Sequence, residues 1–246
     1  MNSLVCISKT PDTTAKISFT EDGKKFNSEG VSYIMNPYDE WYALVKAIEV
    51  KEKLGGEVHV VNVGPASNDI IIRKALAIGA DKAFRVDKDP ESSEDVSAQV
   101  AAFASDKGYD IIFTGKETID HNGSEVGAML AQHMSLPFVS YASDMEADEG
   151  SANVTRDVEG GTQTVKVSYP FVVSAAKGLA EQRIPNMRGI MMAKRKPLEV
   201  VQPVDASSHL AIQKFELPAE KTGVTMIDEN NMDELVRLLH EEAKVI

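Results

Sequence analysis

The chain has 246 residues, 43% of them hydrophobic and 26% charged, which is enough for one substantial core with an appendage. Its formal net charge of −12 argues against binding to a nucleic-acid backbone, because such proteins need a basic surface. The single cysteine, Cys6, excludes an intrachain disulfide; with no apolar stretch of membrane-spanning length, we expect no membrane insertion and a reducing compartment such as the bacterial cytoplasm.

Short apolar runs alternate with helical patterns through the first half of the chain. Asn36 as N-cap and Pro37 in the first turn predict the start of a helix, and Gly55 its end. A later helix is predicted to be capped at Gly108. In chain order the predicted elements are strand 4–7, helix 36–54, strand 58–63, helix 71–78, strand 83–86, helix 96–104 and strand 111–114. Strands joined through helices need parallel crossovers, so we predict an open, mostly parallel, Rossmann-like α/β sheet.

The pattern changes beyond Pro137. Two β-rich runs, 153–158 and 162–167, flank a Glu-Gly-Gly turn and predict a β-hairpin added to the sheet. An apolar strand is predicted at 171–176. We therefore expect an α/β domain over residues 1–202.

Residues 203–246 are predicted to form an extended C-terminal arm that ends in a helix. One face of this helix carries a narrow apolar stripe made of Met232, Leu235, Val236 and Leu239. Such a stripe must be buried, either by the chain's own domain or by a partner subunit, and the residues alone do not choose between them.

Open α/β sheets bind ligands at the carboxyl ends of their strands, near the point where the strand order switches. Segments 6–12, 36–39, 63–65 and 115–126 lie at such ends. In the last of them, Ser124 is predicted to cap a helix whose free amides favour an anionic phosphate. From the residues alone, an ordinary strand–turn–helix loop is an equal alternative, and neither a Walker loop nor G-x-G-x-x-G occurs.

No catalytic or metal-binding constellation is predicted. His121 has no accompanying nucleophile and is interpreted as a solvated loop residue, whereas His59 and His133 fall in strand and helix patterns. Cys6 lies within an apolar run and is interpreted as a small core residue. No compact group of His, Cys and carboxylate residues indicates a metal site.

Residues 182–196 place three methionines and several cations around a Pro and a Gly. Methionine suits surfaces that repack against more than one partner. Composition alone favours another interpretation, a short amphipathic helix in which Met191 and Met192 fill gaps in the core beneath a solvated basic face.

The order Arg-x-x-x-x-x-x-Ile-Met-x-Ala-Lys-Arg-Lys, from Arg183 to Lys196, resembles the signature of the electron-transfer flavoprotein beta-subunit family. Other blocks resemble that family in the same order and cover nearly the whole chain. They are the opening strand and loop 4–12, the Asn-Pro-Tyr helix start at 36–38, the Ala-Leu-Ala-Ile-Gly-Ala-Asp block at 75–81 and the Gly-Lys-x-x-Ile-Asp loop at 115–120.

The resemblance implies an adenine-nucleotide-binding fold that pairs with an alpha subunit carrying the redox FAD. Members hold AMP in the beta subunit, or a second FAD when they bifurcate electrons. Tyr38 would reach towards the alpha-subunit flavin. By resemblance, the cofactor-binding residues are Cys6, Asn36, Pro37, Tyr38, Asp39, Val63, Gly115, Lys116, Ile119, Asp120, His121, Asn122, Gly123, Ser124, Glu125 and Val126.

The resemblance further implies an electron carrier of fatty acid oxidation, not an enzyme in its own right. Segment 182–196 would be the recognition loop that docks on flavin dehydrogenases such as acyl-CoA dehydrogenases, and electrons would pass on to a quinone-reducing acceptor. The docking residues would be Met187, Arg188, Ile190 and Met191, with Met187 where the family has its anchoring leucine.

Three departures from the family pattern bear on the cofactor and the partner. Residues 121–125 differ from both kinds of member, 11–13 lean towards the bifurcating kind, and Arg188-Gly189 replaces a frequent Pro-Asn. Glu125 stands at a Gln position, removing an amide donor and adding negative charge, so the sequence favours AMP over a second FAD. The alternatives are a bifurcating subunit whose own FAD oxidises NADH and a stand-alone nucleotide-binding regulator or hydrolase.

Overall fold

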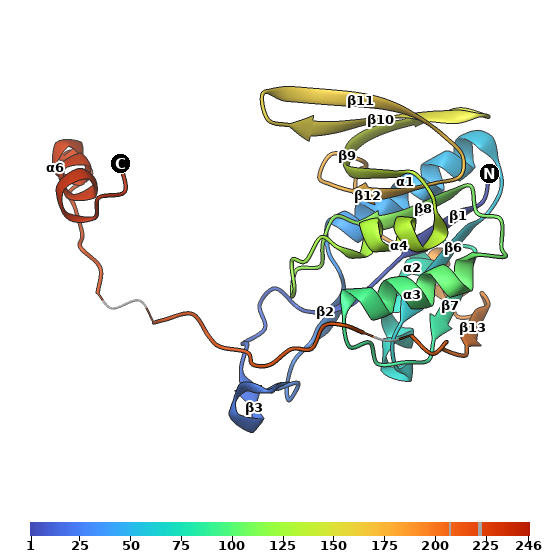
Figure 1. Cartoon of the computed structure of the whole chain (residues 1–246), viewed down its shortest axis with the longest axis horizontal. Coiled ribbons are helices and arrows are strands. Elements are labelled where there is room, and N and C mark those ends of the chain that lie inside the picture. Colours follow the sequence, from blue (N-terminus) through green and yellow to red (C-terminus); the bar gives the residue numbers. More distant parts are fainter. Residues whose placement is uncertain (207, 221–222) are drawn as a thin grey trace. The chain divides into compact units, whose positions relative to one another are not determined.

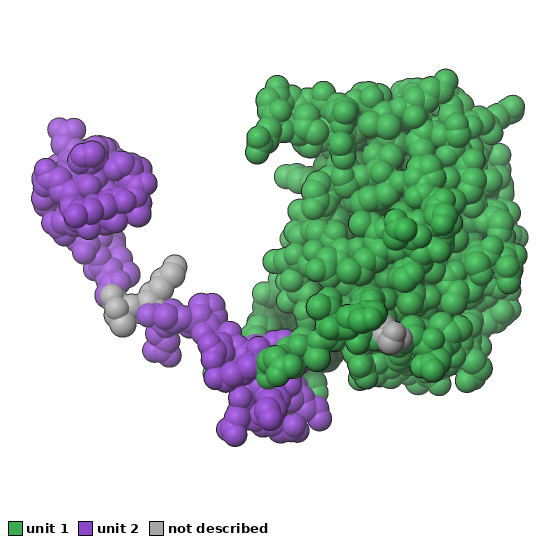
Figure 2. Space-filling model, viewed as in Figure 1, with its two compact units in different colours: residues 1–17, 27–213 green, residues 18–26, 214–246 purple. Residues whose placement is uncertain are grey.

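The computed structural model of the chain describes residues 1–206, 208–220 and 223–246 (Figure 1). It divides into two compact units (Figure 2). Unit 1 comprises Met1–Ile17 with Asn27–Gln213, and unit 2 comprises Ser18–Phe26 with Lys214–Ile246.

In the described part of unit 1, nine strands form one sheet in the order β11-β10-β9-β12-β8-β1-β6-β7-β13. Neighbouring pairs from β9 to β13 are parallel, and the β9–β10 and β10–β11 pairs are antiparallel. The predicted open, mostly parallel sheet with an added hairpin is therefore confirmed. The strands are β1 Ser3–Cys6, β6 Val58–Val63, β7 Lys82–Val86, β8 Ile111–Gly115, β9 Phe138–Ala147, β10 Ser151–Val158, β11 Gly161–Ser168, β12 Phe171–Ala175 and β13 Leu198–Val201.

Helices cover both faces of this sheet. Helices α1 (Asp39–Leu54) and α2 (Asp69–Ile78) share one apolar cluster with Val5 on β1. Helices α3 (Ser93–Ala104) and α4 (Val126–Met134) share the other with Leu4, because successive strand residues point to opposite faces. Since both faces are covered, the central strands are largely buried and mostly apolar, as the sequence pattern indicated.

The order of the strands reverses between β1 and β8. From β1 the chain adds β6 and β7 on one side, and then returns to place β8 on the other side of β1. This is the switch point where an open α/β sheet leaves a crevice at the carboxyl ends of its strands. The segments that follow β1 and β8 therefore meet at one edge of the sheet.

A short antiparallel pair, which the sequence pattern did not predict, brings Asn36 to this edge. Strand β2 (Lys9–Pro11) continues from β1 and pairs with β5 (Tyr33–Met35), and the Asn36 amide then donates to the Ser8 carbonyl at 3.0 Å. The prediction that Asn36 caps the helix is wrong. Helix α1 begins at Asp39 with Tyr38 at the N-cap position, and the buried Asn36 side chain bonds elsewhere.

Helix α3 ends where predicted but is capped differently. Ser92 caps its amino end by accepting a hydrogen bond from the Asp95 amide at 3.1 Å, and Ser105 is its C-cap. Gly108, predicted as the cap, lies three residues further on with φ of 63°. The C-cap of the helix is therefore Ser105, and Gly108 lies in the turn that leads into β8.

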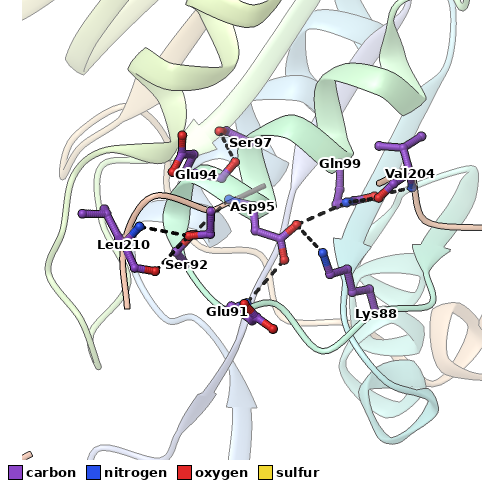
Figure 3. A network of polar contacts seen from close by, with 10 residues as sticks. Lys88, Glu91, Ser92, Glu94, Asp95, Ser97, Gln99, Val204 and Leu210 are labelled. Carbon is purple, nitrogen blue, oxygen red and sulfur yellow. Dashed lines mark hydrogen bonds and ion pairs between the residues drawn. The ribbon is translucent and has the colours of Figure 1, made fainter. Parts of the chain in front are cut away.

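The chain after β13 is held along α3 by polar contacts (Figure 3). The Gln99 amide group donates to the Val204 carbonyl and accepts from the Val204 amide, both at 2.8 Å. Asp95, which is 1% exposed, accepts hydrogen bonds from Lys88 and from Gln99. Further along, the His209 amide and ring bond to Glu94. We call residues 203–206 and 208–210 the strap.

Unit 2 contains an aromatic cluster and the terminal helix. Strands β3 (Phe19–Thr20) and β4 (Lys25–Phe26) flank the turn η1 (Glu21–Gly23), and the Phe19 ring stacks on Phe215 with centroids 5.1 Å apart. Helix α6 (Met232–Arg237) continues into η3 (Leu238–Glu242), which confirms a terminal helix. No residue of α6 or η3 is buried, so the apolar stripe of this helix is uncovered. None of the described helices has the length and apolar character needed to span a membrane.

Candidate functional site

Gly115 ends β8 beside the first turn of α1, at the point where the strand order switches. A Cβ atom at this position would lie 2.8 Å from the Glu40 Cγ and 3.3 Å from the Asp39 Cβ. Only glycine therefore lets the strand end approach the first turn of α1 this closely.

The buried Asn36 side chain fixes the loop that follows β8. Its Nδ2 donates to the Glu117 carbonyl at 3.0 Å, and its Oδ1 accepts from the Ile119 amide at 3.1 Å. Because the Asn36 backbone also bonds to Ser8, one residue joins the segments that follow β1 and β8.

Glu40 reaches into the same place from α1. It is 4% exposed, and its carboxyl oxygens accept from the Ser8 amide at 2.6 Å and from the Ser8 hydroxyl at 2.5 Å. Burial raises the pKa of Glu40 to about 8, although the two hydrogen bonds from Ser8 oppose the shift. Glu40 was not singled out from the sequence. The signal was its spacing, three and four residues before the buried Ala43 and Leu44.

The loop after β8 leads into α4 without a side-chain cap. Helix α4 begins at Val126 with Glu125 at the N-cap position, and no side chain of the described residues accepts from the first-turn amides. The prediction that Ser124 caps this helix is wrong, because Ser124 donates to the Glu117 carboxylate at 3.1 Å. Ser124 and Asn122 also have positive φ angles of 55° and 49°, a strain that clusters at functional sites. The amino end of α4 therefore keeps amides that can bind an anion.

Charges at this edge are partly paired. The Lys116 ammonium lies 3.0 Å from the Glu117 carboxylate, whose hydrogen bond raises the pKa of Lys116. Burial raises the pKa of Asp39, while Lys116 opposes that shift. Lys116 is thus a cation among carboxylates at the strand end, half-exposed and in reach of a ligand.

A hollow of about 290 Å³ adjoins Tyr38 on the α1 side of the crevice. Tyr38 is 54% exposed and has φ of 65°, which is uncommon for a bulky residue and indicates a functional constraint. The sequence prediction missed Tyr42 and Lys177, which also line the hollow. Its lining residues are Pro37, Tyr38, Asp39, Tyr42, Lys116, Glu117, Ile119 and Lys177.

The remaining predicted cofactor residues lie along the same sheet edge. Cys6 and Val63 end β1 and the neighbouring β6 and are buried in the cluster beneath α3 and α4. Burial raises the pKa of the Cys6 thiol, so this residue is not a reactive nucleophile. His121 is exposed, with its Nε2 4.0 Å from the Asp120 carboxylate. Among the described residues, no three His, Cys, Asp or Glu side chains come together as a metal site.

The predicted docking residues lie apart from the crevice, on the short helix α5 (Met187–Ala193). Asn186 caps this helix by accepting from the Gly189 amide at 2.8 Å. Met187 is 74% exposed and Met191 is 67% exposed. Met192 is also exposed and only Ala193 is buried, so the interpretation in which Met191 and Met192 fill core gaps is wrong.

Helix α5 packs closely against α2 and is held there by hydrogen bonds. A Cβ at Gly189 would lie 2.5 Å from the Ala77 carbonyl, so the two backbones are in direct contact. Arg73 on α2 donates to the Ala193 and Lys196 carbonyls. In return, the Lys196 ammonium donates to carbonyls at the end of α2, and its burial lowers its pKa.

Comparison with known proteins agrees with this arrangement. The family model "Electron transfer flavoprotein domain" matches residues 24–206. The chain is 36% identical to the electron transfer flavoprotein subunit beta of Bacillus subtilis, over 100% of both chains. It is 38% identical to that of Syntrophomonas wolfei, over 92% of this chain and 90% of the relative, and 32% identical to that of Homo sapiens, over 98% of each. A family match over most of the chain, with full-length relatives of one kind, shows that the chain belongs to the electron transfer flavoprotein family.

Proposed function

We propose that this chain is the beta subunit of a heterodimeric electron-transfer flavoprotein, with AMP in the crevice between β1 and β8. In this proposal it helps hold the FAD of an alpha subunit, and it is an electron carrier of fatty acid oxidation, not an enzyme. Electrons pass from flavin dehydrogenases of the acyl-CoA type to a quinone-reducing acceptor, in the bacterial cytoplasm or an equivalent reducing compartment.

The observation that carries the proposal is the uncapped amino end of α4 beside the strand-order switch. Helix amino ends favour anions because their free amides and the helix dipole both point at the ligand. Gly115 and Asn36 hold the approach to this end in a fixed shape. A phosphate group at the first turn of α4 would satisfy amides that no side chain caps. The residues present therefore fit the phosphate group of adenosine monophosphate.

Exposed surfaces of the chain support the partners in this proposal. Tyr38 borders the hollow and is half-exposed, so its ring is available to a flavin carried by another subunit. The exposed thioethers of α5 form an adaptable apolar surface on a fixed backbone, which suits docking on dehydrogenases. The uncovered stripe of α6 suits burial against the alpha subunit.

A second candidate, in which the subunit holds a second FAD and oxidises NADH, is favoured by one observation. The hollow beside Tyr38 is continuous with residues of the predicted nucleotide loop, since Lys116, Glu117 and Ile119 line it. A second FAD would require space next to the adenine nucleotide for the rest of the dinucleotide. Against this candidate, the carboxylate of Glu125 at the start of α4 disfavours the additional charge of a pyrophosphate.

Cofactor stoichiometry decides between the candidates. The complete chain is co-expressed with an alpha subunit of the same family, the complex is purified, and its nucleotides are released by denaturation and quantified. One FAD and one AMP per heterodimer is the expected result. Two FAD and no AMP would favour the bifurcating candidate, and a complex with no adenine nucleotide beyond one FAD would overturn the site between β1 and β8.

A further inference from the structure

We propose that nucleotide binding in the crevice is linked to a proton held on the side chain of Glu40. The proposal rests on the nucleotide site proposed above and adds a positioning residue and a pH dependence to it. Glu40 would fix the two loops that surround the ligand and would hold its proton more tightly once a phosphate anion is bound.

Glu40 is buried where the segments that follow β1 and β8 meet. Its carboxyl group is bound twice by Ser8, directly after β1, and its Cγ lies against Gly115 at the end of β8. The neighbouring residue of β8, Thr114, faces Gly127 in the first turn of α4. Glu40 and the amino end of α4 therefore flank the tip of the same strand from opposite faces of the sheet.

The charges around Glu40 leave its carboxylate without a compensating cation. Asp39 on its own helix and Asp120 in the loop after β8 are the acidic neighbours, and the Cys6 thiol lies at the end of β1 on the other face of the sheet. The nearest cation at this edge, Lys116, is paired with Glu117. No ion pair of Glu40 occurs in the part of the chain that the structure describes. Ser8 supplies hydrogen bonds but no charge.

A bound phosphate adds negative charge to this acidic neighbourhood. A dianionic phosphate on the order of 10 Å away, in a medium of effective dielectric constant about 20 and screened by salt with a Debye length of about 10 Å, shifts a pKa by about one unit, which is tenfold in proton affinity. Starting from a pKa of about 8, Glu40 then titrates about one unit higher in the complex. At about pH 8.5 the complex consequently holds about half a proton more than the free chain.

Calorimetric titration of the complete chain with AMP tests this directly. At about pH 8.5 the phosphate of AMP is fully ionised, since its second pKa is about 6, so it takes up no proton itself. Titrations in two buffers with different ionisation enthalpies give the number of protons taken up. The variant is Glu40→Gln, which keeps the shape and an acceptor for Ser8. The matched control is Glu146→Gln, the same substitution at an exposed position on β9.

We expect uptake of about half a proton for the parent chain and for Glu146→Gln, and none for Glu40→Gln. We also expect the AMP affinity of the parent to fall about sixfold between about pH 7.5 and pH 9.5, and that of Glu40→Gln to stay constant. Equal uptake in Glu40→Gln and the parent would overturn the proposal. If Glu40→Gln does not fold, a pH-independent affinity in the parent alone overturns it. AMP binding without proton uptake defeats only this inference, whereas absence of AMP binding at every pH overturns the proposed function as well.

Discussion

Glu40 is a residue in which burial outweighs two hydrogen bonds, and the consequence extends to stability. Its pKa rises from 4.5 to about 8 on folding, so the folded chain holds the proton more tightly than the unfolded chain between these values. The free energy of unfolding therefore receives a contribution that is fully present below about pH 4.5 and is lost as the pH rises towards 8. The helix dipole at the start of α1 favours the ionised form but is too weak to reverse the cost of burial.

Glu40→Gln should remove that contribution to the pH dependence. We expect the parent to lose stability between about pH 5 and pH 8 by about 1.4 kcal/mol per unit of pKa difference, and the variant to lose markedly less. Urea unfolding at fixed ionic strength across this range measures the difference. Glu146→Gln, at an exposed position, should keep the slope of the parent, and an unchanged slope in Glu40→Gln would show that another group titrates.

Gly115 is required for steric reasons, since its backbone is not in the left-handed region. Gly115→Ala places a methyl group 2.8 Å from the Glu40 Cγ, and overpacking of this kind costs about 1–3 kcal/mol. Urea unfolding should show this loss of stability. The purified complex should also contain less AMP. Gly150→Ala is the control, because a Cβ there meets nothing within 4 Å. Equal stability of the two variants would mean that α1 moves aside freely.

At the scale of elements, a substitution on the exposed face of α5 should change docking without changing the stability of the chain. Met187 is 74% exposed, so Met187→Ala should leave the thermal midpoint almost unchanged. If Met187 anchors the docking interface, Met187→Ala should weaken the binding of the dehydrogenase by about 2 kcal/mol or more, roughly thirtyfold in affinity. Electron transfer from a dehydrogenase, measured against its concentration, reports this loss. Val158→Ala at the end of β10, also exposed, is the control, and identical kinetics for both variants would remove Met187 from this role.

Helix α3 should hold the strap mainly through Gln99. Gln99→Ala removes both hydrogen bonds to Val204 and one to Asp95, and each such bond contributes about 0.5–1.5 kcal/mol. Amide hydrogen exchange at Val204 should accelerate, while exchange in the middle of β1 should change little. Gln132→Ala on the exposed side of α4 provides the comparison. Unaltered protection of Val204 would show that the strap is held by other contacts.

Elements with strong periodicity could be predicted, and contacts distant in sequence could not. The strands and helices around β1, β6 and α2 follow from apolar runs and glycine stops, because these signals are local. Strands β2 and β5 have only three residues each, too few for a pattern. The partners of Asn36 lie 81 and 83 residues away, so local capping rules assigned it the wrong role. Glu40 was missed because its charge masked its place on the buried face of α1.

At the scale of the whole molecule, unit 2 ends in helix α6, whose apolar residues are exposed. Truncation after Gln213 removes α6 with its exposed Met232 and Val236, which are 50% and 55% exposed. Each large apolar side chain that a partner fully buries contributes about 1.5–3 kcal/mol. We therefore expect the truncated chain to lose its alpha subunit during co-purification while the thermal midpoint of unit 1 changes little. Retention of the alpha subunit at unchanged yield would contradict this assignment.

The mounting of α5 on α2 has a consequence for the lifetime of complexes. Arg73 and Lys196 hold the backbone around α5 through hydrogen bonds to carbonyl groups, whereas the Met187 and Met191 side chains are exposed. A partner that docks there has only side-chain rotamers to restrict, at about 0.5–1.5 kcal/mol each, and no loop to order. Encounters should then become productive without a slow folding step, and the weakly directional thioether contacts should release as readily as they form. A subunit with such a docking surface is suited to short-lived complexes with several electron-donating dehydrogenases in succession.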